Sequence, residues 1–146
     1  MERKFFSKLT IIVAVLIGVC FMGSAYAVKQ MTADDFITDC GNHIKGISLG
    51  EAKKYHEMSE YVFLDVRTEK EFKRGSIPNA ILVQRGLLEF KVAKKIPDKN
   101  AKIIVYCKSG KRSHLSACTL TKMGYKNVVS MSGGWKAWVK AGYPVG

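Results

Sequence analysis

Short apolar runs alternate with segments that carry helix signals along most of this chain. Four runs are rich in β-branched or aromatic residues and are bounded by turn formers, which is typical of buried strands: 61–64, 80–83, 102–106 and 126–131. Because strands that alternate with helices form parallel sheets covered on both faces, the pattern predicts an α/β three-layer sandwich around a central parallel sheet.

Helix signals stand between the strands. Ser48–Glu51 and Thr68–Glu71 both have the spacing of a capping box, in which a hydroxyl and a carboxylate close the first helical turn. The expected helices and helical turns cover 32–40, 48–58, a short turn from Thr68, 85–96, 113–123, and a last helix from Gly133–Gly134 that carries Trp135 and Trp138. Gly124 is a suitable C-terminal residue for the helix over 113–123.

The candidate chemistry follows the strand over 102–106. Cys107 begins a tight turn into the next helix, and Lys108, Gly110, Lys111 and Arg112 follow it. Such a turn points several backbone N–H groups into one hollow at the positive end of the helix dipole, which favours a thiolate. A lone cysteine is more often a buried structural residue, but three cations and a glycine within five positions favour a nucleophile in an anion-binding hollow.

Two charged residues follow the strand over 61–64, at the sheet edge where open α/β folds place their sites. For Asp65 and Arg67 we favour a structural interpretation, a local ion pair that braces the loop. Arg85 follows the strand over 80–83 and either faces the site or is solvated.

The segment from Cys107 to Ser113 resembles the active-site loop of the rhodanese (sulfurtransferase) family. Four further matches support it: Leu64–Arg67 with Glu71–Phe72, Gly75–Ala80, Gly133–Trp138 and Ala141–Val145. The resemblance runs from about Ser48 to the C-terminus. It implies a rhodanese-like fold and transfer of the outer sulfur of thiosulfate, or another sulfane donor, to cyanide or a thiol through a Cys107 persulfide.

The resemblance also implies roles for the loop. Cys107 would be the nucleophile and sulfur carrier, and no cofactor is expected. The backbone N–H groups of the loop would stabilise the thiolate and the persulfide. The expected substrate-binding residues are Lys108, Ser109, Gly110, Lys111, Arg112 and Ser113. Of these, Lys108 could equally be solvated, and Ser113 could donate a hydrogen bond or cap the helix.

Two other functions use a similar loop. Cysteine phosphatases and arsenate reductases place five residues between cysteine and arginine, whereas four separate Cys107 from Arg112. The smaller ring favours a single sulfur atom over a phosphoryl group. A persulfide carrier, or a partner-binding rhodanese module, would keep the same loop.

The N-terminus has the features of a targeting segment. Three basic residues precede an apolar run of 14 residues, Leu9–Met22, and Ala25-Tyr26-Ala27 gives a small-x-small cleavage signal. We therefore expect a signal peptide at 1–27, an N-terminal extension at 28–47 and a rhodanese domain at 48–146. The expected location is periplasmic or secreted, with an uncleaved membrane anchor as the alternative because ~20 residues are needed to span a bilayer.

Charge and cysteine content complete the expectations. The chain carries a net charge of +12, and removal of residues 1–27 leaves +10, which suits anionic small molecules or a negative membrane surface. No nucleic-acid motif is present, and scattered His and Cys residues argue against zinc. Three cysteines remain after cleavage, which leaves at least one free thiol or one intermolecular pairing, and Cys107 is the expected free thiol. Cys40 could pair with Cys118, serve as a resolving thiol for Cys107, or simply be packed, which is the default for both Cys40 and Cys118. The expected partners are a small anionic sulfur donor and a cyanide or thiol acceptor, which could include a protein thiol, and we expect a monomer.

Overall fold

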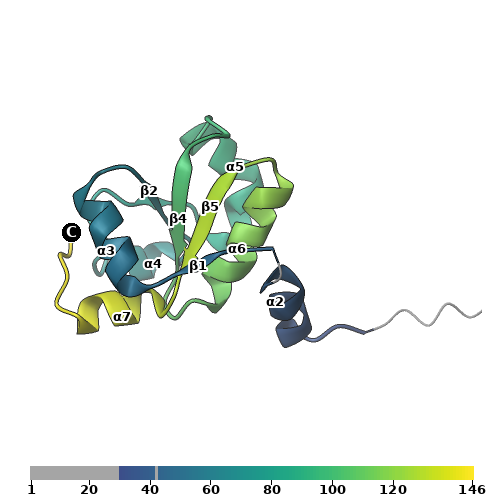
Figure 1. Ribbon diagram of the computed structural model, residues 1–146, viewed down its shortest axis with the longest axis horizontal. Helices are drawn as coiled ribbons and strands as arrows, with labels where there is room; N and C mark the ends of the chain where they lie inside the picture. Colours follow the sequence, from purple (N-terminus) through teal and green to yellow (C-terminus); the bar gives the residue numbers. More distant parts are fainter. Residues whose placement is uncertain (1–29, 42) are drawn as a thin grey trace, which may run out of the picture. The chain divides into compact units, whose positions relative to one another are not determined.

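The computed structural model describes residues 30–41 and 43–146, so the expected signal peptide lies outside the described residues. The elements follow in the order α2 (Ala33–Gly41), β1 (Gly46–Ile47), α3 (Leu49–Glu57), β2 (Val62–Asp65), α4 (Glu69–Phe72), β3 (Ile81–Leu82), η1 (Arg85–Leu87), α5 (Leu88–Lys95), β4 (Lys102–Tyr106), α6 (Lys111–Lys122), β5 (Asn127–Met131) and α7 (Gly134–Lys140) (Figure 1).

The strands form one five-stranded sheet in the order β1-β5-β4-β2-β3. All four neighbouring pairs are parallel. The predicted parallel sheet is therefore confirmed. Strand β4 is central, and the residue that follows it, Cys107, lies at the carboxyl edge of the sheet.

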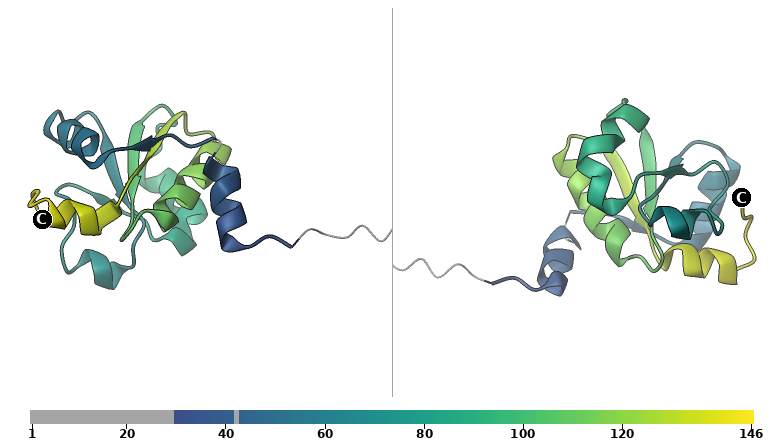
Figure 2. Two further views of the ribbon diagram at one scale, coloured as in Figure 1. Left: turned by 60° about the horizontal axis from the view of Figure 1, so that its bottom comes forward. Right: turned by 180° about the vertical axis from the view of Figure 1, so that it is seen from behind.

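Alternate side chains of the strands build two separate cores. Leu64, Ile103 and Val105 pack on one face with buried residues of α5 and α6. Phe63 and Ile104 pack on the other face with Ala52 of α3 and Trp138 of α7. Figures 1 and 2 show the same division, with α5 and α6 on one side of the sheet and α3 and α7 on the other. The period of two in a strand thus makes the three layers.

The predicted capping boxes are present. Ser48 and Thr68 each accept a hydrogen bond from the backbone N–H three residues on, and Glu51 and Glu71 each accept one from the backbone N–H of the cap residue. Thr32 and Asp35 make the same reciprocal bonds at the start of α2. These local bonds satisfy N–H groups that a helix start leaves unpaired, so they fix where the chain turns.

Three elements differ from the prediction. Strand β1 was not predicted, because two residues give no periodic signal, yet Gly46 and Ile47 pair in parallel with Ser130 and Met131. The strand predicted over 80–83 has only two paired residues. Helix α6 begins at Lys111 rather than Ser113, since left-handed Gly110 (φ 107°) starts it without a side-chain cap.

Of the three alternatives for Cys40, pairing with Cys118 is the one observed, so the default of packing alone does not hold. They form a disulfide that joins α2 to α6, with their Cα atoms 5.7 Å apart. Both side chains are also buried in the core beside α6. Among the described residues, Cys107 is the free cysteine. No helix in the described part of the chain has the length and apolar character to cross a membrane.

Candidate active site

The Cys107 thiol lies at the end of the central strand, at the floor of the loop. Its residue is 1% exposed. The backbone N–H of Gly110 points at the sulfur, with 3.2 Å between N and Sγ. Gly110 reaches this position in the left-handed region and then begins α6, so the sulfur lies beside a helix N-terminus. The loop thus presents a backbone donor to the sulfur at the positive end of a helix dipole.

The start of α7 fixes the backbone of the loop from below. The N–H of Trp135 donates to the carbonyl of Cys107 at 2.7 Å, and that of Lys136 donates to the carbonyl of Lys108 at 3.1 Å. This contact requires a glycine at 134, because φ is +58° there and a Cβ would collide with the carbonyl oxygen of Cys107. The loop is thus held between the N-termini of two helices.

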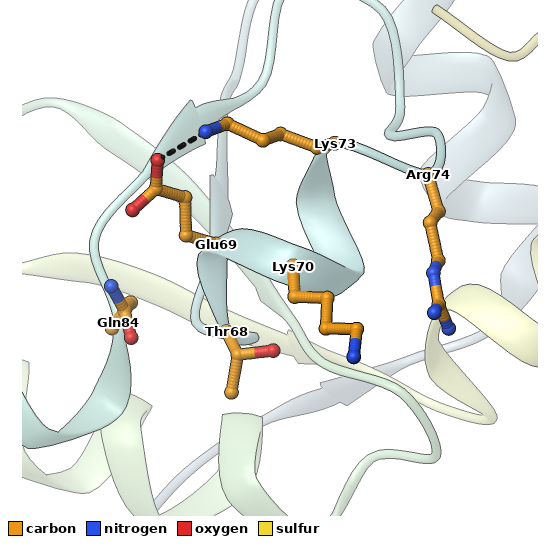
Figure 3. A pocket seen from close by; sticks show the side chains of 6 residues that line it. All are labelled: Thr68, Glu69, Lys70, Lys73, Arg74 and Gln84. Carbon is orange, nitrogen blue, oxygen red and sulfur yellow. Dashed lines mark ion pairs between the residues drawn. The ribbon is translucent and has the colours of Figure 1, made fainter.

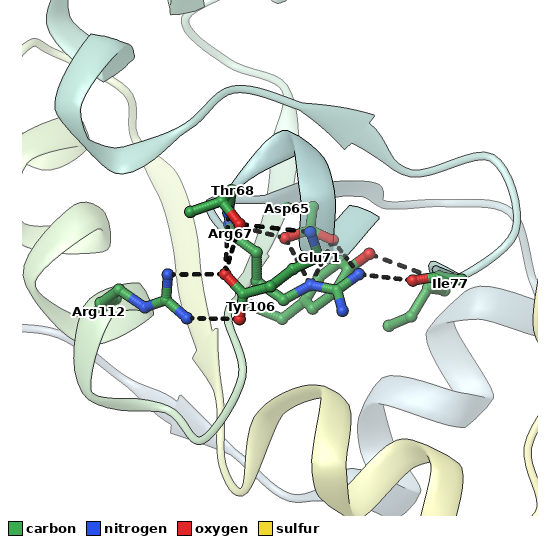
Figure 4. Close-up of polar contacts among 8 residues, drawn as sticks. Asp65, Arg67, Thr68, Glu71, Ile77, Tyr106 and Arg112 are labelled. Atoms are coloured by element: carbon green, nitrogen blue, oxygen red, sulfur yellow. Dashed lines mark hydrogen bonds and ion pairs between the residues drawn. The ribbon is translucent and has the colours of Figure 1, made fainter. Parts of the chain in front are cut away.

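Arg112 is oriented by Glu71, a carboxylate for which the sequence indicated no contact with the loop. Both terminal nitrogens of its guanidinium donate to Glu71, at 3.2 and 3.0 Å (Figure 4). Glu71 is itself held by the N–H and hydroxyl of Thr68. The capping box of α4 therefore positions the partner of the loop arginine.

These contacts fix the charges of the pair. The hydrogen bond from Arg112 lowers the pKa of Glu71 to about 2, with further contributions from Thr68. The same hydrogen bond raises the pKa of Arg112, and the nearby Cys107 thiol adds to the rise. Glu71 thus holds the Arg112 guanidinium in its charged form in the loop that contains Cys107.

The expected ion pair between Asp65 and Arg67 is present and buried, with 2.7 Å between Nη2 and Oδ2. Arg67 also donates to the carbonyl of Gly75 at 2.8 Å. Its guanidinium lies 4.6 Å from the ring centre of Trp135, whose N–H holds the Cys107 carbonyl. Asp65 and burial together raise the pKa of Tyr106, with burial the larger cause. The pair thus braces the loop through Trp135. Figure 4 shows Asp65 and Arg67 beside Tyr106.

The remaining predicted residues are distributed around the loop. Lys108 and Ser109 are exposed. Lys111 is exposed and lies 3.5 Å from Asp34 of α2. Ser113 is buried, and its hydroxyl donates to the carbonyl of Gly110 and contacts the hydroxyl of Ser130. It follows the helix start, so the suggestion that it caps the helix is wrong.

Arg85, which the sequence left open, pairs with Glu89 at 2.9 Å and donates to Thr119 of α6. It therefore links α5 to α6 rather than standing free in solvent.

An open hollow of about 610 Å³ lies beside α4 at the same edge of the sheet. Its lining residues are Thr68, Glu69, Lys70, Lys73, Arg74 and Gln84 (Figure 3). Glu69 pairs with Lys73, while neither Lys70 nor Arg74 has an ion-pair partner within residues 30–41 and 43–146. This surface adds positive charge near the carboxyl ends of β2 and β3.

No cluster of three or more His, Cys, Asp or Glu residues suitable for a metal occurs in the described part of the chain.

The fold and the loop define an α/β domain with a cysteine at the centre of an anion-binding turn. Residues 48–141 match the rhodanese-like domain, and the chain belongs to this family. A sulfurtransferase of Allochromatium vinosum is 31% identical over 104 residues, which cover 71% of this chain and 94% of the relative.

Solved structures with a similar fold include two that are 28–32% identical to this chain. A protein of unknown function from Rhodopseudomonas palustris, described as a possible tyrosine phosphatase, has a TM-score of 0.75 at 32% identity and covers 80% of this chain and 96% of its own. The polysulfide-sulfur transferase homodimer of Wolinella succinogenes has a TM-score of 0.64 at 28% identity, over 75% and 82% of the two chains. The family supports sulfur transfer as the general activity of this protein.

Proposed function

We propose that this protein is a sulfurtransferase that carries sulfur as a persulfide on Cys107. The donor is thiosulfate or another sulfane sulfur compound, and the acceptor is a thiol or cyanide. The observation that carries the proposal is the position of the Cys107 sulfur, which accepts the N–H of Gly110 at the start of α6. The family of the chain supports the same chemistry.

The reaction has two displacement steps. In the first, the Cys107 thiolate attacks the outer sulfur of thiosulfate, a new S–S bond forms, and sulfite leaves with the electron pair of the old S–S bond. In the second, an acceptor thiolate or cyanide attacks the outer sulfur of the persulfide, and the Cys107 thiolate leaves. No external oxidant or reductant is needed, because each step breaks one bond to sulfur and forms another.

The cations of the loop would stabilise the negatively charged species of the reaction, which are the thiolate, the sulfur donor and the departing sulfite. Arg112 belongs to the loop that contains Cys107 but already binds Glu71 through two nitrogens. We therefore assign it to stabilise the thiolate and the departing sulfite, with Lys108 and Lys111 attracting the sulfonate end of the donor. The N–H of Gly110 already points at the sulfur, so its contribution needs no movement and is preorganised.

The second candidate function is phosphoester hydrolysis, which the description of the Rhodopseudomonas palustris structure brings forward. The ring between Cys107 and Arg112 contains four residues, and the sulfur is nearly fully buried. Both features favour a single sulfur atom over a phosphoryl group in this loop.

A persulfide carrier that serves one protein partner would form the same intermediate on Cys107. It would differ from the enzyme because its reaction with thiosulfate would show no saturable turnover.

Mass spectrometry tests the proposal. Purified protein treated with thiosulfate should gain roughly 32 Da on the peptide that contains Cys107, and cyanide should remove the added sulfur and yield thiocyanate. The Cys107→Ser variant should show neither change while keeping the circular dichroism of the wild type. Thiocyanate production by that variant would refute the assignment. Cys107-dependent hydrolysis of an aryl phosphate without the mass gain would favour the phosphatase.

We also propose a periplasmic or secreted location. It depends on the expected signal peptide at residues 1–27, which lies outside the described residues. Fractionation of cells and N-terminal sequencing of the protein would test both the export and the expected cleavage after Ala27.

A further inference from the structure

Helix α2 lies outside the segment that matches the family, yet it contacts the helix that carries the catalytic loop. Near its start, the carboxylate of Asp34 lies 3.5 Å from the Nζ of Lys111, the first residue of α6. Near its end, Cys40 forms the disulfide with Cys118 in the middle of α6. Figures 1 and 2 show α2 alongside α6. The helix is therefore attached to α6 at both ends.

A hollow of about 300 Å³ lies where α2 meets the loop. Ile37 of α2 lines it together with Ser109, Gly110, Lys111 and His114. Gly110 is the residue whose N–H points at the Cys107 sulfur. A side chain of α2 thus shares a hollow with the residue that contacts the reactive atom.

Besides the disulfide, only an exposed ion pair and half-buried side chains among the described residues hold α2 against α6. Cys40 is its one buried residue, and its largest apolar side chain, Phe36, is 51% exposed. A helix of nine residues is too short to be stable by itself in water. The chain after it is anchored independently, because Ile44 is buried and β1 pairs with β5. Loss of the disulfide would therefore release α2 and leave the sheet intact.

We propose that α2 positions the Cys107 loop, and that the Cys40–Cys118 disulfide makes this positioning depend on redox state. The inference rests on the proposed role of Cys107. While the disulfide is present, Ile37 covers one side of the loop and Asp34 neutralises Lys111. After its reduction, α2 detaches, the hollow opens and Lys111 becomes available to an anionic donor.

The reductant is a thiol, the same chemical class as the proposed acceptor. Two thiols deliver two electrons and two protons to the Cys40–Cys118 bond, which gives two protein thiols and one disulfide of the reductant. A thiol acceptor would therefore accept sulfur from Cys107 and also release the helix beside it.

The test compares the oxidised full chain with Cys40→Ala/Cys118→Ala and with Asp34→Asn. Asp39→Asn is the matched control, because it removes the same charge from an exposed position of α2 that has no ion pair among the described residues. Three measurements are made: amide hydrogen exchange over residues 107–112, the rate at which iodoacetamide alkylates Cys107, and thiosulfate kinetics.

We expect loop exchange and Cys107 alkylation to rise by about threefold or more in the double variant, since local openings become more frequent. Asp34→Asn should lower the KM for thiosulfate by about two- to fivefold with kcat unchanged, because the ion pair is exposed and its loss frees only Lys111. Asp39→Asn should match the wild type in all three measurements.

One outcome would overturn the proposal: the double variant folds and its α2 amides exchange faster, but its loop exchange and Cys107 alkylation stay at the wild-type rates. In that case α2 only stabilises the fold. If the double variant does not fold, Ile37→Ser decides, because it keeps the disulfide and removes the side chain that lines the hollow. An unchanged alkylation rate in that variant would also overturn the proposal. Exchange and alkylation need no turnover, so they test this inference even if the protein fails to transfer sulfur.

Discussion

At the scale of single residues, the site depends on neighbouring side chains that fix the charge and orientation of the residues in the catalytic loop. Glu71 is the clearest case, because it both closes the capping box of α4 and binds Arg112 through two hydrogen bonds. The sequence reveals the first role through the spacing from Thr68, but the second role joins residues 41 positions apart and has no local signature. One carboxylate thus connects the start of a short helix to the catalytic loop.

The lowered pKa of Glu71 predicts how stability depends on pH. The pKa falls from 4.5 in the unfolded chain to about 2 in the folded protein, so the contribution is fully present above about 4.5 and is lost as the pH falls towards 2. Between pH 6 and pH 3, Glu71→Gln should lose about 1–2 kcal/mol less unfolding free energy than the wild type, allowing for partial exposure of the pair.

Urea unfolding at the two pH values measures this difference. Glu89→Gln is a suitable control, because that carboxylate also pairs with an arginine, Arg85, but lies away from the loop. A Glu71→Gln variant that lost as much stability as the wild type would show that the pair is not formed in solution.

At the scale of elements, the N-terminus of α7 is part of the active-site scaffold. Its first N–H groups bind the carbonyls of Cys107 and Lys108, so the loop is fixed by a helix that follows it by more than twenty residues. The close approach depends on Gly134, whose left-handed conformation and missing side chain leave room for the Cys107 carbonyl.

Gly134→Ala should therefore impair catalysis more than any other small substitution in α7. A Cβ would push against the loop backbone and strain φ, so we expect sulfur-transfer kcat/KM to fall by about tenfold or more, since small misplacements of a nucleophile are costly. Gly50→Ala in α3 is the matched control: no atom lies within 4 Å of its added Cβ, and alanine favours a helix. Equal activity of the two variants would show that the loop tolerates the shift.

The elements also show what the sequence could and could not reveal. The parallel sheet, the capped helices and the strand that ends at Cys107 were predictable, because periodicity and capping residues act locally. Strand β1 was not, since two residues carry no period. The start of α6 depends on a left-handed glycine rather than a capping side chain. The Cys40–Cys118 pair spans 78 residues, and such a spacing favours no particular pairing.

At the scale of the whole molecule, the positive charge surrounds the site as well as lining it. The chain has 24 basic and 12 acidic side chains. Lys70 and Arg74 extend into the hollow beside α4 without an ion-pair partner in the described part of the chain (Figure 3). A field of this sign should raise the local concentration of anionic donors at the carboxyl edge of the sheet.

Two alkylating reagents of similar size separate this field from the reactivity of the thiol. Iodoacetate is an anion and iodoacetamide is neutral, so their relative rates at Cys107 report the local potential. The iodoacetate-to-iodoacetamide ratio should fall by about threefold or more when salt rises from roughly 0.02 M to roughly 0.5 M, because salt screens the attraction. The Lys70→Gln/Arg74→Gln variant should lower the ratio at low salt. The control is Lys45→Gln/Lys126→Gln, whose changes lie just before β1 and β5. This control should leave the ratio nearly unchanged. Equal ratios in both variants would mean that the loop cations alone attract the anion.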